Sequence, residues 1–444
     1  LGGTPITDPY TGTPGFPGFD PTASQTLGYI LAMQEHGIPV TYGYIEDAHQ
    51  NYATGNAAGP GDAAHESNLA ADNSAFATFF ARLAAAGITP QNTLFIFSSD
   101  EGDHFAGTRD PSPAGCDGIT TFCVFPKGSI GELAANVTGL LAEHDSGAPT
   151  DYQIEDDTAP NFYLNGEPAQ GGSDERTLEQ DLGVLKVPDP YTGGMISFTN
   201  YLADQTEENI LHMVTADPDR TPTFTDFANT DLYVSTGSST CTPPSSSSAN
   251  TATSDPCVVI DPGYAWDHGD VAPEINTNWV GFVGPGVANN GVDSNTWTDE
   301  TDVRPTLMAL AGLTDDYEHA GRVIYEILDR AVHPSGLNGS QDYDAFLSLG
   351  ATYKQLEASV GEFGMATLKA ATIGLESTTT STYQTMETDL KSLGSQRDAL
   401  SATIESDLES VEFHGGSLSA AQADALTTQA RALISQAESL PGKL

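Results

Sequence analysis

Apolar and polar residues follow one another early in the chain in a pattern that predicts helices alternating with strands. Residues 26–36 carry apolar side chains at helical spacing, and a near-continuous apolar run follows at residues 38–45. Residues 76–85 repeat the helical spacing, and a second apolar run follows at residues 93–97. Near-continuous apolar runs are typical of strands that are buried on both faces. The order of these elements predicts a βαβ unit in a parallel sheet.

The same pattern returns later in the chain. Residues 279–283 form a third apolar run that leads into Gly-Pro-Gly, and residues 303–311 are helical in spacing. Between these elements and the first unit, residues 145–260 are rich in turn-forming residues, and we interpret them as loop-rich. The sequence therefore predicts an α/β domain whose strands come from distant parts of the chain.

The C-terminal part is helical in pattern throughout. Residues 347–375 and 383–411 carry apolar residues three and four apart, and Ser419 with Gln422 forms a candidate capping box for a last helix. We expect an all-α helical hairpin or small bundle, through which the protein could form oligomers.

A chain of 444 residues is too long for one ordinary core and indicates two domains. The change of pattern places the boundary so that residues 1–332 form the α/β domain and residues 333–444 form the helical domain.

The charge balance excludes several classes of partner. The chain has 15 Lys and Arg against 61 Asp and Glu, a net charge of -46. Such a surface repels nucleic-acid phosphates and anionic lipid headgroups, so we expect no nucleic-acid binding. No apolar run approaches the roughly 18 residues of a membrane-spanning helix, so we expect no membrane span.

The cysteines indicate the compartment. They fall into two local pairs, Cys116 with Cys123 and Cys241 with Cys257, and neither pair has the spacing of a metal-binding CxxC motif. Two disulfides that close surface loops are the natural interpretation, and they predict a secreted, extracellular protein.

Three groups of carboxylates and histidines lie directly after or beside predicted strands. The first comprises Glu46, Asp47 and His49, the second Asp100, Glu101, Asp103 and His104, and the third Asp267, His268 and Asp270. Ligands bind at the edge of an open parallel sheet where its strands end, so we expect the three groups to converge. Gathering so many carboxylates is unfavourable unless a cation neutralises them.

The ligand types predict divalent metal ions as the cofactors. Mixed imidazole and carboxylate ligands favour zinc, whereas the carboxylate-rich second group also suits manganese or calcium. The choice among the three metals stays open.

These motifs resemble those of the alkaline phosphatase superfamily, which contains phosphatases, sulfatases, nucleotide pyrophosphatases and phosphodiesterases. Asp47 with His49 is similar to the family's Asp-plus-His pair, and Ser99-Asp100-Glu101-Gly102 to its Ser-Asp-His-Gly after a strand. His268 before the Gly-Pro-Gly strand resembles the family's later histidine. The run from Asp302 to Gly312 closely matches its Asp-x-x-Pro-Thr-Leu helix.

The resemblance implies an α/β/α sandwich with a mostly parallel central sheet and two metal positions. It implies that Asp47, His49 and His268 hold one metal ion and that Asp100 and Glu101 hold the other. It also implies a phosphoester substrate and a metal-activated Ser or Thr nucleophile that forms a covalent phosphoenzyme. Glu101 stands where the family commonly has histidine, so His104 is the candidate catalytic residue.

The family's nucleophile comes from a strand and helix upstream of the Asp-plus-His pair, and the residues before Asp47 offer no such segment. One expectation is that a precursor is cleaved before Leu1 and that the upstream fragment stays bound. The other is a degenerate relative that binds metal without catalysis. The sequence thus predicts a secreted metal-dependent phosphodiesterase or phosphatase, and the alternative is a non-catalytic extracellular structural or assembly protein.

Overall fold

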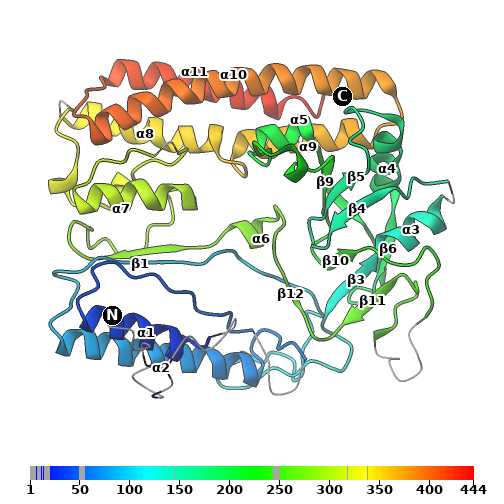
Figure 1. Ribbon diagram of the computed structural model, residues 1–444, viewed down its shortest axis with the longest axis horizontal. Coiled ribbons are helices and arrows are strands. Elements are labelled where there is room, and N and C mark those ends of the chain that lie inside the picture. The colour runs from blue at the N-terminus through cyan, green and yellow to red at the C-terminus, as the bar shows by residue number, and fades with distance from the viewer. Residues whose placement is uncertain are drawn as a thin grey trace.

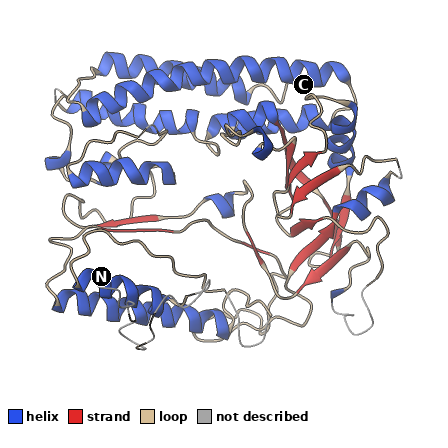
Figure 2. Ribbon diagram, viewed as in Figure 1, coloured by secondary structure: helices blue, strands red, loops and turns tan. Residues whose placement is uncertain are grey.

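The computed structural model describes residues 7, 12, 14, 21–49, 56–145, 147–243, 251–317, 319–337 and 339–444. The C-terminal helices lie together along the top of the view, most strands gather at its right, and the N-terminal helices lie at the bottom (Figures 1 and 2). The principal helices are α1 (Ala23–Glu35), α2 (Ala63–Ala85), α3 (Val137–His144), α4 (Ser173–Val184), α5 (Gln205–Ile210), α6 (Pro273–Asn276), α7 (Val303–Ala311), α8 (Ser340–Glu357), α9 (Glu362–Glu376), α10 (Thr380–Phe413) and α11 (Ala420–Glu438). The short 3-10 helices are η1 (Pro218–Arg220), η3 (Glu300–Asp302), η4 (Tyr325–Ile327) and η5 (Arg330–Val332).

The strands are short, with two to six residues each. They are β1 (Phe95–Ser98), β2 (His104–Phe105), β3 (Glu132–Asn136), β4 (Tyr152–Glu155), β5 (Asn161–Leu164), β6 (Lys186–Asp189), β7 (Gly194–Ser197), β8 (Thr199–Asp204), β9 (Phe224–Ala228), β10 (Leu232–Ser235), β11 (Val258–Asp261), β12 (Trp266–Asp267) and β13 (Val280–Val283).

The predicted fold class is wrong. The described strands form five small sheets, of which the largest has four strands in the order β4-β5-β9-β8, and no large parallel sheet is present among them. Every strand pair in these sheets is antiparallel except β10 with β3. The α/β/α sandwich therefore gives way to a mixed α/β fold with small, mostly antiparallel sheets and a C-terminal helical bundle.

The predicted βαβ unit fails at its first strand. Residues 38–45 are not assigned to a strand, and β1 pairs with β13 in an antiparallel ladder, with Phe95 opposite Val283. The helices before these segments form as expected. Thr22 caps α1 in a capping box with Gln25, and α2 extends over residues 63–85, well beyond the predicted 76–85.

The loop-rich stretch of residues 145–260 contains more regular structure than the sequence analysis identified. This stretch contains β4 to β11 with α4 and α5, and it contributes much of the larger hydrophobic core. Its strands are only four to six residues long, and turn residues separate them closely, so the composition of the turns concealed the strands.

The C-terminal helices α8 to α11 form the predicted helical bundle. Ser419 and Gln422 make the expected capping box at the start of α11. The larger core joins this bundle to the preceding strands, because one cluster of packed buried side chains includes residues of both, from Leu133 in β3 to Leu440 after α11. The smaller core lies apart and joins α1, α2 and β1 through Leu31, Leu83, Phe95 and their neighbours. The boundary between residues 332 and 333 stays a prediction.

The Asp302 motif has a structural role in this fold. Asp302 is fully buried, accepts a hydrogen bond from the backbone of Arg322 at 2.8 Å and lies 3.3 Å from the ammonium of Lys354 in α8. The Thr306 hydroxyl accepts a bond from the backbone of Ile324. These buried contacts fix α7 against the helical bundle, and they account for the motif without any ligand.

Candidate functional site

The second and third groups of site residues meet through a two-stranded ladder. In the β2–β12 pair, His104 lies opposite Asp267 and Phe105 opposite Trp266. The backbone of Gly102 adds a bond to the carbonyl of Ile275 at 2.9 Å. A β-carbon on Gly102 would lie 2.6 Å from that carbonyl oxygen, so only glycine allows this approach. Antiparallel pairing, and not the edge of a parallel sheet, therefore brings the two groups together.

Asp103 is the central residue of the site. One of its carboxylate oxygens lies 3.5 Å from Nδ1 of His49, and the other lies 3.4 Å from Nδ1 of His268. Nε2 of His268 lies 3.4 Å from Oε1 of Glu101. His49 of the first group and His268 of the third group therefore both contact Asp103 of the second group, and His268 also contacts Glu101. We call Asp47, His49, Asp100, Glu101, Asp103 and His268 the acid–histidine cluster.

The ionisation of Asp103 and His268 follows from these contacts. Burial opposes ionisation of Asp103, but the hydrogen bonds with His268 and His49 lower its pKa to about 2. The hydrogen bond with Asp103 raises the pKa of His268 to about 9. Asp103 is therefore an anion, and His268 carries a positive charge between two carboxylates.

Asp47 and Glu101 lie within the same electrostatic environment. Burial raises the pKa of Asp47, and the carboxylates of Asp103 and Asp100 raise it further. Burial likewise raises the pKa of Glu101, while His268 opposes the change. Four carboxylates and two imidazoles are thus close enough to affect one another, and the predicted residues Asp47, His49, Asp100, Glu101 and His268 all lie in this cluster.

His104 lies beside the cluster but has a different environment. Its Nε2 is 2.9 Å from Asp231 and its Nδ1 is 3.0 Å from Glu274. Burial alone would lower its pKa, but the two carboxylates raise it. Both contacts are shorter than the 3.4 Å contacts that His268 makes with Asp103 and Glu101, so His104 is held more closely by its carboxylates and is less available to a substrate or metal ion. Its catalytic role stays a prediction that this geometry does not favour.

Three further buried carboxyl groups are close enough to interact with the histidines of this region. Asp267 is buried and accepts a hydrogen bond from Thr158 at 3.0 Å. Burial raises its pKa well above the ordinary value, and the charge of Glu132 adds to this shift. Burial raises the pKa of Glu132 to about 7, against the opposing effect of the two cluster histidines. Asp270 is also buried, which raises its pKa to about 7.

An aromatic side chain that the sequence analysis did not select covers one histidine. Trp266 stacks on His49 with ring centroids 5.5 Å apart, and His65 lies 5.6 Å from the same indole. The indole N–H donates to the carbonyl of Ala58 at 2.7 Å, which fixes the ring. Only its position two residues before His268 could have suggested this role.

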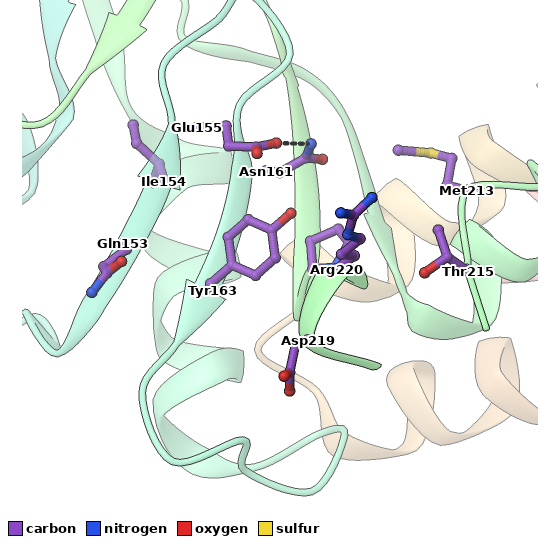
Figure 3. Close-up of a pocket in the computed structure, with 10 residues that line it drawn as sticks. Gln153, Ile154, Glu155, Asn161, Tyr163, Met213, Thr215, Asp219 and Arg220 are labelled. Atoms are coloured by element: carbon purple, nitrogen blue, oxygen red, sulfur yellow. Dashed lines mark hydrogen bonds between the residues drawn. The ribbon is translucent and has the colours of Figure 1, made fainter. Parts of the chain in front are cut away.

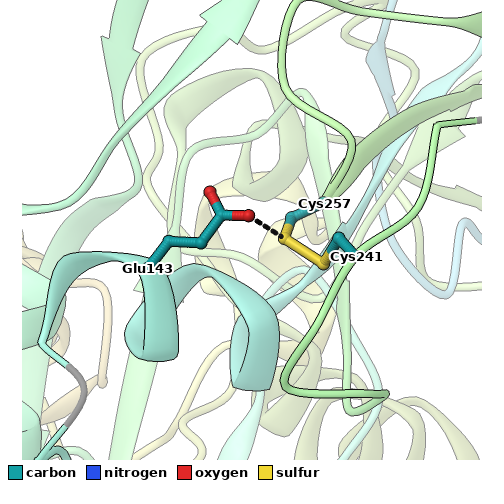
Figure 4. A group of neighbouring side chains, drawn as sticks. All are labelled: Glu143, Cys241 and Cys257. Carbon is teal, nitrogen blue, oxygen red and sulfur yellow. Dashed lines mark hydrogen bonds between the residues drawn. A yellow bond between two sulfur atoms is a disulfide. The ribbon is translucent and has the colours of Figure 1, made fainter.

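The donor chemistry of the cluster fits a divalent cation, but its present side-chain positions are those of ion pairs. In the part of the chain that the structure describes, Glu143, Cys241 and Cys257 form the only group of three such residues with ligand atoms within 4.8 Å of one another (Figure 4). Those cysteines share a disulfide, so their sulfur atoms are not available to a metal ion. In the cluster, the histidines contact the carboxylates and offset their negative charge, which a bound cation would also do.

The disulfides form as predicted. Cys116 pairs with Cys123 and Cys241 with Cys257, and both bonds are consistent with an oxidising compartment. Among the described helices, none is long and apolar enough to cross a membrane.

A surface cavity of about 770 Å³ lies away from the cluster (Figure 3). Its lining comes from β4, β5 and the loop before β9, and includes Gln153, Glu155, Asn161, Tyr163 and Arg220. Asn161 donates to Glu155 at 3.1 Å, so part of the polar lining is already paired. None of its lining residues belongs to the acid–histidine cluster.

A separate set of carboxyl groups lies deep between α4, α5, β8 and α10. We call Glu175, Glu179, Asp204, Glu207, Glu208 and Glu387 the buried carboxyl layer; all six are buried. Burial raises the pKa of Glu175 to about 7, and burial together with the neighbouring Glu387 raises that of Asp204 to about 8. Burial also raises the pKa values of Glu179, Glu207 and Glu208 well above the ordinary range.

Comparison of the chain with family models, with curated proteins and with solved structures found no match.

Proposed function

We propose that the chain belongs to a secreted, divalent-cation-dependent hydrolase of phosphoester bonds, with the acid–histidine cluster as its cation site. The convergence of residues from three distant segments on Asp103 carries this proposal. This convergence does not require a large parallel sheet, because the β2–β12 ladder and the turn at residues 48–49 bring the segments together. The two disulfides support an extracellular location.

The donor set divides naturally around Asp103. Asp47, His49 and Asp103 offer two carboxylates and one imidazole, while His268 and Glu101 offer donors on the other side. This mixture suits zinc, and the carboxylates also suit manganese or calcium. A bound divalent cation would polarise a phosphoryl oxygen and offset the charge that develops during hydrolysis.

The chain's own residues would prepare the site for an anionic substrate. Four carboxylates in the cluster repel phosphate, so a cation must bind before the substrate does. Asp103 holds His49 and His268 in place, and Trp266 covers one face of His49. His104, held by two carboxylates, would position β2 next to the cluster and stay outside the reaction.

The first test measures cation binding directly. Calorimetric titration of the metal-free protein with Zn²⁺, Mn²⁺ and Ca²⁺ should show saturable binding of at least one ion. His268→Ala and Asp103→Asn should weaken it about a hundredfold, because each removes a central donor. His414→Ala is the matched control, since His414 is exposed and lies near Glu409, outside the cluster.

The second test measures hydrolysis by the native protein of a model phosphomonoester and a model phosphodiester. The proposal expects turnover that chelation abolishes and that His268→Ala reduces to background. Unchanged metal content and turnover in His268→Ala would contradict it. Absence of cation binding by the wild-type protein would favour the alternative of a structural or assembly protein.

A further inference from the structure

Residues 38–45 form an extended segment with the side-chain alternation of a strand. Val40 and Tyr42 are 82% and 90% exposed, whereas Thr41 and Ile45 on the other face are partly buried. Ile45 packs into the smaller core together with Phe97 of β1. One face of the segment therefore lies on the core, while large apolar side chains of the other face are in solvent.

The backbone of this region is open to pairing. Within the described residues, no backbone–backbone hydrogen bond involves residues 39–43, although the Gln34 amide donates to the Thr41 hydroxyl at 2.9 Å. In the same part of the structure, β1 makes its strand pairing with β13 alone. Unpaired N–H and C=O groups of extended backbone are a template for an additional strand.

Helices lie on both sides of this open region. Beneath β1, α1 and α2 form the smaller core, and α7 lies on the opposite side of the β1–β13 pair (Figure 1). Leu307 and Leu313, in and just after α7, are 38% and 54% exposed. A strand bound between these helices would be covered on both faces and would need apolar side chains on both. The exposed apolar side chains of this region are suitable contacts for such a strand.

We propose that this surface binds an extended apolar strand of a partner polypeptide, which pairs with the open edge of β1 and covers Val40 and Tyr42. Recognition by strand addition draws its affinity from main-chain hydrogen bonds and its specificity from alternate side chains. The strand carries Lys or Arg near an end, because Glu300, which accepts a hydrogen bond from Ser98 of β1, and Asp100 lie at one end of β1. A second copy of the chain, with its charge of -46, is disfavoured by repulsion.

The position of the surface connects it with the acid–histidine cluster. Asp47 follows two residues after Ile45, and Asp100 follows two residues after Ser98. One end of the bound strand would therefore lie beside the cluster and contribute a side chain to it. This last step rests on the proposed function, whereas the binding itself does not.

The test is a selection of strand peptides. A phage-displayed library of random peptides about eight residues long is selected against the chain. We expect enriched sequences with apolar residues throughout and a basic residue near an end. A synthetic peptide of the enriched sequence should bind the double variant Val40→Glu/Tyr42→Glu at least about tenfold more weakly than the wild type. The double variant Ile119→Glu/Val292→Glu is the control, because these side chains are 84% and 95% exposed elsewhere.

Hydrogen exchange then identifies the mode of binding. The peptide should slow exchange of the amides at residues 39–43 and 95–98, and N-methylation of alternate peptide amides should abolish this protection. Failure of every selected peptide to distinguish the two double variants would overturn the proposal. A dimer of the chain alone that Val40→Glu/Tyr42→Glu dissociates in sedimentation would assign the surface to a second copy and also overturn it. Cation binding is measured on the same variants, so failure of the proposed function is seen separately.

Discussion

The acid–histidine cluster and the buried carboxyl layer are both rich in carboxyl groups, yet their chemistry is opposite. In the cluster, hydrogen bonds with His49 and His268 keep Asp103 ionised. In the layer, burial dominates and raises the pKa of Glu175 to about 7 and that of Asp204 to about 8. The difference shows that the partners decide the state of Asp103: hydrogen bonds with two imidazoles keep it an anion, whereas carboxyl groups in the dry core hold their protons.

The cations near the layer do not reverse this effect. Arg176 pairs with Glu179 and Lys391 lies 2.6 Å from Glu387, but several carboxylate oxygens of the layer have no hydrogen-bond partner among the described residues. Gln170 donates to both Asp204 and Glu387, which places these two carboxyl groups side by side. A proton on Asp204, next to the charge of Glu387, is therefore the arrangement that costs least.

The largest expected effect is a loss of stability of the layer at high pH. A carboxyl group whose pKa is raised by folding stabilises the protein fully below its unfolded pKa and loses that contribution as pH rises through about 7 to 8. Glu175 alone would contribute roughly 3 kcal/mol. Urea unfolding between about pH 5 and pH 9 should show the loss, and high salt should leave most of it, since buried groups are poorly screened. A flat profile in high salt would mean that the layer is ionised.

The cluster should show the opposite sign in acid. Because folding lowers the pKa of Asp103 to about 2, its contribution is present above about pH 4 and is lost as pH falls towards 2. Asp103→Asn should remove this acid limb of the unfolding profile. It should also reduce the loss of stability as pH rises towards about 9, because it removes the hydrogen bond that raises the pKa of His268.

His104→Gln tests whether that residue is structural. The variant leaves Asp231 and Glu274 without their shared cation, and it should lower the free energy of unfolding by roughly 1–3 kcal/mol. Cation affinity should change little. A large loss of affinity with unchanged stability would return His104 to the site as a functional residue.

Glu387→Gln removes the charge that raises the pKa of Asp204. At about pH 8 we expect the variant to be more stable than the wild type by roughly 1–2 kcal/mol, and at about pH 5 nearly equal. Asp424→Asn, at an exposed position of α11, is the control and should have little effect at either pH. Equal effects of the two substitutions on stability would contradict the inference that Glu387 destabilises the layer at high pH.

The smallest expected effect is that of Trp266→Phe. The ring can still stack on His49, but the bond to Ala58 is lost, so the free energy of unfolding should fall by roughly 1 kcal/mol. Cation affinity, measured by titration, should fall only slightly. A loss as large as that of His268→Ala would mean that the indole positions His49 directly.

The sequence predicted local structure better than it predicted pairing. The C-terminal helices, the Ser419 capping box and both disulfides depend on neighbouring residues, and their periodicity or spacing identified them. Strand partners depend on distant residues. The run at residues 93–97 forms β1, but its antiparallel pairing with β13 is not encoded in either run alone.

The residues of the acid–histidine cluster do lie together, but the reason for which they were grouped is wrong. Asp47, Glu101 and His268 were grouped as strand-end residues of one parallel sheet, but turns and the β2–β12 ladder bring them together. The residues that the sequence analysis missed, Asp231 and Glu274, lie far from His104 in the sequence and carry no motif. Trp266 was missed because an aromatic residue in an apolar run is usually core.

The close approach of Gly102 to the carbonyls of Ile275 and Glu274 means that the backbone of the cluster is held independently of the cluster side chains. Main-chain atoms, which no side-chain substitution removes, lock the loop after β1 to the short helix α6. A single side chain of the cluster can therefore be replaced while the backbone keeps its shape. Replacing Gly102 would instead separate the loop after β1 from α6 and displace all the cluster side chains that this loop carries.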